Sequence, residues 1–217
     1  MARASRCENG SPDRHGPYPV TSALEWSVAS RPFPGEIESG DRYEALERDE
    51  GLVLAVIDGL GHGPSAAAAA ASAAAAVRVH ASEALPVIVR ACGAALAGER
   101  GAVLTIARID PTGTLTWLGV GNATGHVWRR SSLGFEIVSV APLARGVIGS
   151  SLPDLQEKRV ELVAGDVIVL TSDGIAQPER WSPRFLGAPR YAAEAWLAER
   201  ARDDDDALAL VARYGAV

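Results

Sequence analysis

The sequence predicts an α+β sandwich, mainly because of the order of its apolar segments. Short runs with the apolar pattern of strands come in two groups, and helical segments are inserted between these groups. A doubly wound sheet would need helices alternating with each strand, which this pattern does not show. Of the 217 residues, 47% are hydrophobic and 22% charged, which is enough for one core of moderate size.

The beginning of the chain differs in composition from the rest. Residues 1–22 are polar and rich in Gly, Pro, Ser and Arg, so they cannot bury enough apolar surface to offset their ordering entropy. We therefore expect a flexible N-terminal arm over residues 1–22. A single domain is predicted for residues 23–217, because no internal repeat divides it.

Three strands are predicted before the first helix, over residues 24–30, 42–46 and 52–58. A turn with the sequence GLGHGP follows the third strand. Residues 65–81 then form an alanine-rich helix, preceded by Pro64 at a position where a helix tolerates proline. Since alanine side chains are small, this helix can lie very close to a neighbouring sheet.

The second half of the chain is predicted to consist mostly of strands. A second helix, with Ser82 as its N-cap, ends near Gly98. Pro111-Thr112-Gly113 indicates a hairpin between the first two strands that follow. The strands predicted in this half cover residues 102–110, 114–122, 126–130, 135–140, 158–163, 166–173 and, after a helix over residues 190–202, residues 207–214.

Charge and cysteine content argue against several classes of function. The chain has 21 basic and 27 acidic residues, and its net charge of -6 argues against a general binder of nucleic acid or anionic membranes. The longest apolar run, residues 66–77, is too short and too weakly hydrophobic to span a bilayer. The N-terminus lacks the apolar stretch of a secretory signal, and Cys7 and Cys92 make no disulfide framework, so we expect a cytoplasmic protein.

Four acidic positions are expected to meet at one edge of the structure. Asp58 and Asp173 each follow an apolar strand and precede a glycine, whereas Asp41 and the aspartate run 203–206 each precede a strand. In an antiparallel sheet the end of one strand lies beside the start of its neighbour. Carboxylates that are gathered in this way repel one another unless cations neutralise them, and oxygen ligands favour Mg²⁺ or Mn²⁺ over Zn²⁺. Each acid alone is more typical of a turn or a solvated loop, so the metal site is predicted from the set.

The ordered motifs resemble those of a known family, the metal-dependent PPM-type serine/threonine phosphatases of the bacterial SpoIIE group. The resemblance covers residues 24–214. Within this group, AVIDGLGHG, the segment 100–102 and the short length are most similar to the RsbX-type phosphatases, which reset the stressosome. The motifs that carry the resemblance are Gly40-Asp41, the loop 58–63, Gly121-Asn122, Ser172-Asp173-Gly174 and Asp205-Asp206-Ala207.

This resemblance implies two stacked antiparallel sheets with helices packed outside, an α-β-β-α sandwich, and two Mn²⁺ or Mg²⁺ ions at one edge. It implies that Asp58 bridges both ions and that the carbonyl of Gly59 binds one of them. Asp173 and Asp205 would complete the other, and Asp41 would contribute directly or through water.

Two positions leave the resemblance incomplete. The aspartate run leaves the register open, so Asp206 is the alternative to Asp205 as a metal ligand. Leu208 stands where the family often has threonine, two residues after the aspartate pair, which weakens a supporting hydrogen bond but removes no metal ligand.

The activity implied is hydrolysis of phosphoserine or phosphothreonine on a partner protein by a water held between two cations. His62 lies four residues after Asp58 and is a candidate proton donor to the leaving alkoxide, although a histidine in a glycine-rich turn is often only a hydrogen-bonding loop residue. The resemblance implies that the partner is a phosphorylated STAS-domain protein of a bacterial stress-response or sigma-factor pathway.

Two other functions are kept as alternatives. One is a catalytically inactive binding module that retains the phosphatase fold. The other is a nucleotide-binding regulator that uses the glycine-rich turn, although this turn lacks the ending of a P-loop and the spacing of a dinucleotide site.

Asn122 is either an orienting residue near the metals or a turn residue. Arg31, Arg42 and Arg145 are candidates for binding phosphate, although surface solvation is the commoner fate of such residues.

Overall fold

The computed structural model describes residues 24–150, 152, 154–177 and 182–215. The arm predicted for residues 1–22 lies outside this part of the chain. Among the described residues, no helix is both long enough and apolar enough to cross a membrane.

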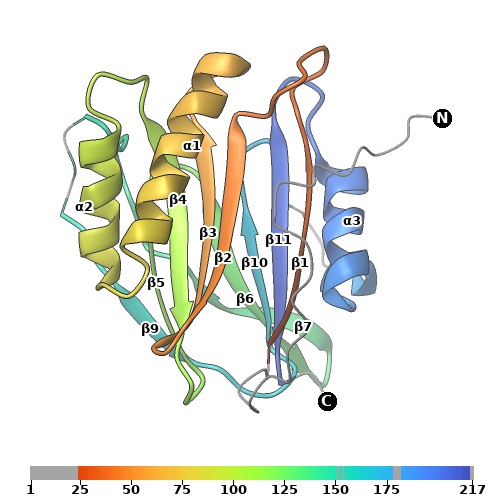
Figure 1. Ribbon diagram of the computed structural model, residues 1–217. Coiled ribbons are helices and arrows are strands. Elements are labelled where there is room, and N and C mark those ends of the chain that lie inside the picture. The colour runs from red at the N-terminus through yellow and green to blue at the C-terminus, as the bar shows by residue number, and fades with distance from the viewer. Residues whose placement is uncertain (1–23, 151, 153, 178–181, 216–217) are drawn as a thin grey trace, which may run out of the picture.

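Two sheets lie face to face with helices on both outer sides, which confirms the predicted α-β-β-α sandwich (Figure 1). The first sheet has the strand order β1-β11-β10-β6-β7. Its strands are β1 (Leu24–Arg31), β11 (Ala207–Tyr214), β10 (Val167–Thr171), β6 (Thr124–Ser131) and β7 (Gly134–Val140).

The second sheet has the order β2-β3-β4-β5-β8, and β9 also pairs with β5. Neighbouring strands are antiparallel in both sheets except for β5 and β8, which run parallel. The two-residue strand β8 was not predicted, and this pair corrects the expectation of fully antiparallel sheets. The strands are β2 (Asp41–Arg48), β3 (Gly51–Gly59), β4 (Ala102–Ile109), β5 (Thr114–Val120), β8 (Leu143–Ala144) and β9 (Lys158–Glu161).

The central strands are apolar on both faces because each sheet is covered on both sides. In β3, Leu54 and Val56 face the other sheet, while Val53, Ala55 and Ile57 face the helices. The same alternation holds in β10 and β11, where the even-numbered residues face the other sheet and the odd-numbered residues face a helix. This alternation also decides whether a residue at the end of one of these strands faces the other sheet or the helices.

Helices α1 (Pro64–Val79) and α2 (Leu85–Ala95) cover the outer face of the second sheet. The alanine-rich helix is confirmed, although it ends at Val79 instead of residue 81. The predicted N-cap of α2 is wrong: Ala84 is the N-cap residue, not Ser82, because Pro86 occupies the first turn and sets the start of the helix. Gly98 lies beyond the helix, in a turn with φ 89°.

Helix α3 (Pro189–Arg200) and the short 3-10 helix η1 (Pro183–Leu186) cover the outer face of the first sheet. Trp196 is buried between α3 and this sheet, and its indole Nε1 donates a 3.0 Å hydrogen bond to the carbonyl oxygen of Phe185. The prediction placed α3 correctly to within two residues but did not include η1.

Candidate metal and active site

Strand pairing brings the acidic residues that were singled out from the sequence to one edge of the sandwich. Asp41 at the start of β2 is directly opposite Asp58 near the end of β3. Asp173 follows the end of β10, and Asp205 and Asp206 precede the start of the adjacent strand β11. We call these five residues, Asp41, Asp58, Asp173, Asp205 and Asp206, the acidic edge.

The alternation of the strands explains why part of this edge lies between the sheets. Asp58 extends the even-numbered face of β3, which packs against the other sheet, and Asp41 is its partner across the strand pair. Asp41 is only 3% exposed, as is Asp206 on the opposite sheet. Carboxylates at this depth need hydrogen bonds or cations as partners.

Ser172 joins the two sheets at the acidic edge. Its Oγ donates a 2.7 Å hydrogen bond to Oδ2 of Asp41 and accepts a 2.9 Å hydrogen bond from the backbone N–H of Leu208. Leu208, which stands where the family that the sequence resembles often has threonine, therefore contributes through its backbone. No separate role was predicted for Ser172 from the sequence, although it stands next to Asp173.

Asn122 orients a second carboxylate. Its side-chain Nδ2 donates a 2.5 Å hydrogen bond to Oδ2 of Asp173, across the two sheets. Of the two interpretations of Asn122, this contact supports the orienting residue.

Two glycines at the acidic edge are required by close packing. A Cβ on Gly59 would lie 2.1 Å from the carbonyl oxygen of Ala66 in α1, and a Cβ on Gly174 would lie 1.8 Å from the carbonyl oxygen of Asp206. The glycines that follow Asp58 and Asp173 therefore each let another segment approach closely. The alanine-rich start of α1 has the small side chains that this approach needs.

Burial and mutual repulsion perturb the protonation of the acidic edge. Burial raises the pKa of Asp58 well above its ordinary value of 3.8, and the charges of Asp41 and Asp173 raise it further. Burial likewise raises the pKa of Asp41, with Asp206 among the neighbouring charges, while the hydrogen bond from Ser172 opposes this rise. Burial and the charge of Asp173 raise the pKa of Asp205. Such a group of carboxylates favours bound protons or bound cations.

The residues present fit a hard divalent cation. Oδ1 of Asp41 is buried and has no hydrogen-bond partner among the described residues, so this oxygen is free to bind an ion. Within the described ranges, no three His, Cys, Asp or Glu side chains form a group that could hold a metal ion by themselves. Mg²⁺ commonly keeps several waters and binds only one or two carboxylates. A site with few direct protein ligands therefore suits Mg²⁺ better than an ion that must be enclosed by protein ligands.

The structure distinguishes Asp205 from Asp206. Oδ1 of Asp206 accepts a 2.8 Å hydrogen bond from the backbone N–H of Phe33, whereas Oδ2 is buried and has no hydrogen-bond partner among the described residues. Asp205 is more exposed; its charge raises the pKa of Asp58, and the charge of Asp173 raises the pKa of Asp205. We therefore keep Asp205 as the proposed ligand and assign Asp206 to holding the loop 32–40, a role that the sequence analysis missed.

His62 lies in the glycine-rich turn and is held by that same loop. Its Nδ1 is 3.2 Å from Oε1 of Glu36, and its ring stacks on Phe33 with a centroid distance of 4.3 Å. The Glu36 carboxylate also lies against Gly63, at the N-terminus of α1. An acidic group in this place would repel a nucleotide phosphate, which argues against the phosphate-binding interpretation of the turn.

The three arginines considered as phosphate ligands have different surroundings. Arg31 donates to the carbonyl oxygen of Arg202, and Arg42 donates to the carbonyl oxygens of Ser39 and Asp41, so both are engaged with backbone. Arg145 is exposed. Arg100 was not predicted for this role from the sequence, although its Nη1 lies close to Gly61 in the glycine-rich turn.

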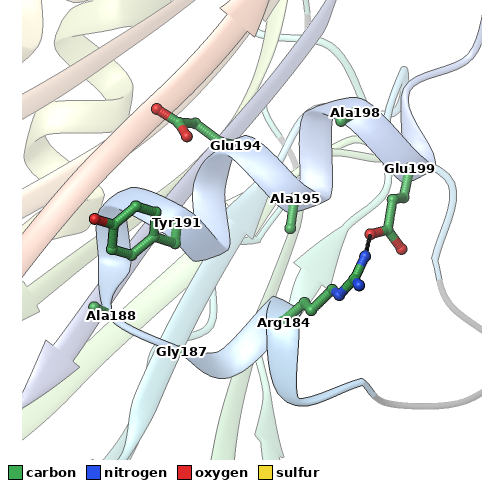
Figure 2. Close-up of a pocket in the computed structure, with 8 residues that line it drawn as sticks. All are labelled: Arg184, Gly187, Ala188, Tyr191, Glu194, Ala195, Ala198 and Glu199. Carbon is green, nitrogen blue, oxygen red and sulfur yellow. Dashed lines mark hydrogen bonds and ion pairs between the residues drawn. The ribbon is translucent and has the colours of Figure 1, made fainter.

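A separate cavity of about 440 Å³ lies between η1 and α3 (Figure 2). Figure 2 shows Tyr191 at one end and the ion pair between Arg184 and Glu199 at the other. None of its lining residues belongs to the acidic edge. It is therefore no part of the candidate metal site.

Comparison with known proteins relates most of the described residues to the SpoIIE family and to one phosphatase. The family model described as Stage II sporulation protein E (SpoIIE) matches residues 48–214. The phosphoserine phosphatase RsbX of Bacillus subtilis (strain 168) is 25% identical over 146 residues, which cover 67% of this chain and 71% of RsbX.

Solved structures share the fold over most of the chain. A chain from "The bacterial stressosome: a modular system that has been adapted to control secondary messenger signaling" has a TM-score of 0.78 and 29% identity, covering 88% of this chain and 99% of that chain. RsbX in complex with magnesium has a TM-score of 0.74 and 20% identity, with 88% and 95% covered. The catalytic domain of serine/threonine phosphatase PstP in complex with two manganese ions has a TM-score of 0.67 and 18% identity, with 89% and 99% covered. The last two show the fold alone.

Proposed function

The chain belongs to the SpoIIE family, which has the PP2C-type phosphatase fold, and from this premise we propose that it is a Mg²⁺- or Mn²⁺-dependent protein phosphatase. Its substrate class is phosphoserine or phosphothreonine on a partner protein. The observation that carries this proposal is the acidic edge, where residues from two sheets and distant parts of the sequence converge. Structural turns would not require such a costly accumulation of carboxylates.

In this proposal Asp58, Asp173, Asp205 and the carbonyl of Gly59 hold two divalent ions, and Asp41 contributes directly or through water. When bound, these ions would polarise the phosphoryl group and lower the pKa of the attacking water. Ser172 fixes Asp41 by its 2.7 Å hydrogen bond, and Asn122 fixes Asp173. His62 is the proposed proton donor to the leaving serine or threonine oxygen.

The proposed partner is a phosphorylated STAS-domain protein in a bacterial stress-response or sigma-factor pathway. Two similarities support it: RsbX of B. subtilis is a phosphoserine phosphatase, and the 29% identical chain comes from work on the bacterial stressosome. The net charge of -6 argues against a nucleic-acid partner.

The test compares purified protein after chelation and after adding back Mn²⁺ or Mg²⁺, with p-nitrophenyl phosphate and a phosphoserine peptide as substrates. We expect hydrolysis of both only with metal, and loss of activity to the chelated level in Asp58→Asn and Asp173→Asn. Asp49→Asn, a change in an exposed turn, is the matched control and should keep full activity.

Other results would favour the alternatives. A folded wild-type protein that hydrolyses neither substrate with Mn²⁺ would favour the catalytically inactive binding module. Titration with ATP, with and without metal, tests the nucleotide-binding regulator, because a phosphatase should show no tight binding that depends on adenine.

A further inference from the structure

We propose that Glu36 is a positioning residue for His62, which it holds as a proton donor by accepting a hydrogen bond from Nδ1. This inference rests on the proposed phosphatase function and names a residue that neither the motifs nor the acidic edge includes. Oε1 of Glu36 is 3.2 Å from Nδ1 of His62. Because an ionised carboxylate can only accept, the proton of this contact belongs to Nδ1.

A turn in the loop 32–40 places Phe33 and Glu36 so that both contact His62. Phe33 and Glu36 are the first and fourth residues of a turn closed by a 2.9 Å hydrogen bond from the Glu36 N–H to the Phe33 carbonyl. Pro34 and Gly35 occupy its centre, and Gly35 has φ 96°, the pattern of a type II turn. The Phe33 ring therefore stacks on the imidazole, with an interplanar angle of 16°, while Glu36 binds Nδ1.

The loop that carries this turn is fixed to the acidic edge at both ends. At one end, the Phe33 N–H donates to Asp206. At the other, the carbonyl oxygen of Gly40 accepts a 3.1 Å hydrogen bond from the N–H of Gly59. His62 is thus tied to the edge through Glu36 and Phe33 as well as through its own turn.

This arrangement leaves the other ring nitrogen for chemistry. Within the described part of the chain, Nε2 of His62 makes no hydrogen bond, and the side chain is 52% exposed. As a new bond forms between the water oxygen and phosphorus, the bond from phosphorus to the serine oxygen breaks, and its electron pair stays on that oxygen. The proton on Nε2 of the imidazolium then passes to this oxygen, while Nδ1 keeps its own proton and continues to donate it in the hydrogen bond to Glu36.

The first test uses leaving groups of different quality. A proton donor matters most for phenyl phosphate or a phosphoserine peptide and least for p-nitrophenyl phosphate, whose leaving group departs without help. Glu36→Ala should lower kcat on the poor leaving groups roughly tenfold, a part of the ~10²–10⁴-fold typical of acid–base catalysis, with little change on p-nitrophenyl phosphate. Glu36→Gln, which keeps an acceptor but loses the charge, should lie in between.

Two controls separate positioning from general damage. Glu38→Gln changes an exposed carboxylate in the same loop and should leave all rates unchanged. In a His62→Ala background, Glu36→Ala should cause no further loss. An equal fall on all substrates, or a further loss without His62, would overturn the proposal.

The second test does not depend on turnover. In the metal-free protein near pH 8, the ¹⁵N resonances of His62 should report a proton on Nδ1 in the wild type and a mixture of tautomers in Glu36→Ala. A wild type without the Nδ1 proton contradicts the inference. If the wild type with Mn²⁺ is inert but shows this tautomer, the phosphatase function fails while the contact between Glu36 and His62 stands.

Discussion

Ser172 on one sheet donates a hydrogen bond to Asp41 on the other, although the two residues are 131 positions apart in the sequence. The same hydroxyl accepts from the backbone of Leu208, so it satisfies a buried carboxylate and a buried N–H at once. The separation of the two sheets at the acidic edge is therefore set partly by the side chain of Ser172.

Ser172→Ala should cost about 1–3 kcal/mol of unfolding free energy, because it leaves the Leu208 N–H and one oxygen of Asp41 without a partner. Urea unfolding of the metal-free protein measures this. Ser139→Ala is the matched control, since the Ser139 hydroxyl is also buried but has no hydrogen-bond partner in the part of the chain that the structure describes. Its removal should therefore be neutral or stabilising. Equal losses in both variants would show that the contact between Ser172 and Asp41 contributes nothing specific.

Much of the fold was predictable because the apolar pattern is strong where a strand is covered on both sides. Strands β3 and β10, which lead to Asp58 and Asp173, were predicted from long apolar runs, and the alanine-rich helix from its composition and Pro64. The second helix was predicted to begin too early, since a serine that suits an N-cap does not become one unless the chain turns there. The two-residue strand β8 has no local pattern and exists only through its pairing with β5.

The site was predictable at its strand ends but not at its supports. Antiparallel pairing is sufficient to expect Asp41 beside Asp58, and the register confirms that proximity. The contacts of Ser172 and Glu36 depend on how two sheets stack and how a loop folds back, which no local pattern encodes. The separate roles of Asp205 and Asp206 likewise depend on the path of the loop before β11.

Gly59→Ala should destabilise the protein, because its Cβ would lie 2.1 Å from the carbonyl oxygen of Ala66 and push α1 away from the sheet. Overpacking of this kind typically costs about 1–3 kcal/mol. Thermal unfolding monitored by circular dichroism measures the loss. Gly187→Ala, where the new Cβ would be 3.6 Å from its nearest neighbour, should be tolerated. If Gly59→Ala melts with the wild type, α1 does not pack on the sheet as closely as the structure has it.

Cys92 should be unreactive in the folded protein. It is buried beneath α1, and burial raises the pKa of its thiol to about 12, so almost no thiolate exists near neutral pH. In a Cys7→Ser variant, which leaves one thiol, a disulfide reagent at pH 8 should react only after denaturant is added. Rapid labelling of the native variant would mean that the space between α1 and α2 opens readily.

The raised pKa values of Asp58 and Asp41 predict that the metal-free protein becomes less stable as the pH rises. Above their ordinary value of 3.8, the unfolded chain has released protons that the folded protein still holds, so the free energy of unfolding falls with increasing pH until the raised values are passed. Urea unfolding in the presence of a chelator, between about pH 5 and pH 8, measures this slope.

Asp58→Asn should flatten the dependence of stability on pH because the amide stays neutral, whereas Glu38→Gln should not. Mn²⁺ added at the upper end should restore stability to the wild type and far less to Asp58→Asn, because a cation that binds only the folded state stabilises it. A wild type whose metal-free stability rises over this interval would show that these carboxylates are not held together in solution.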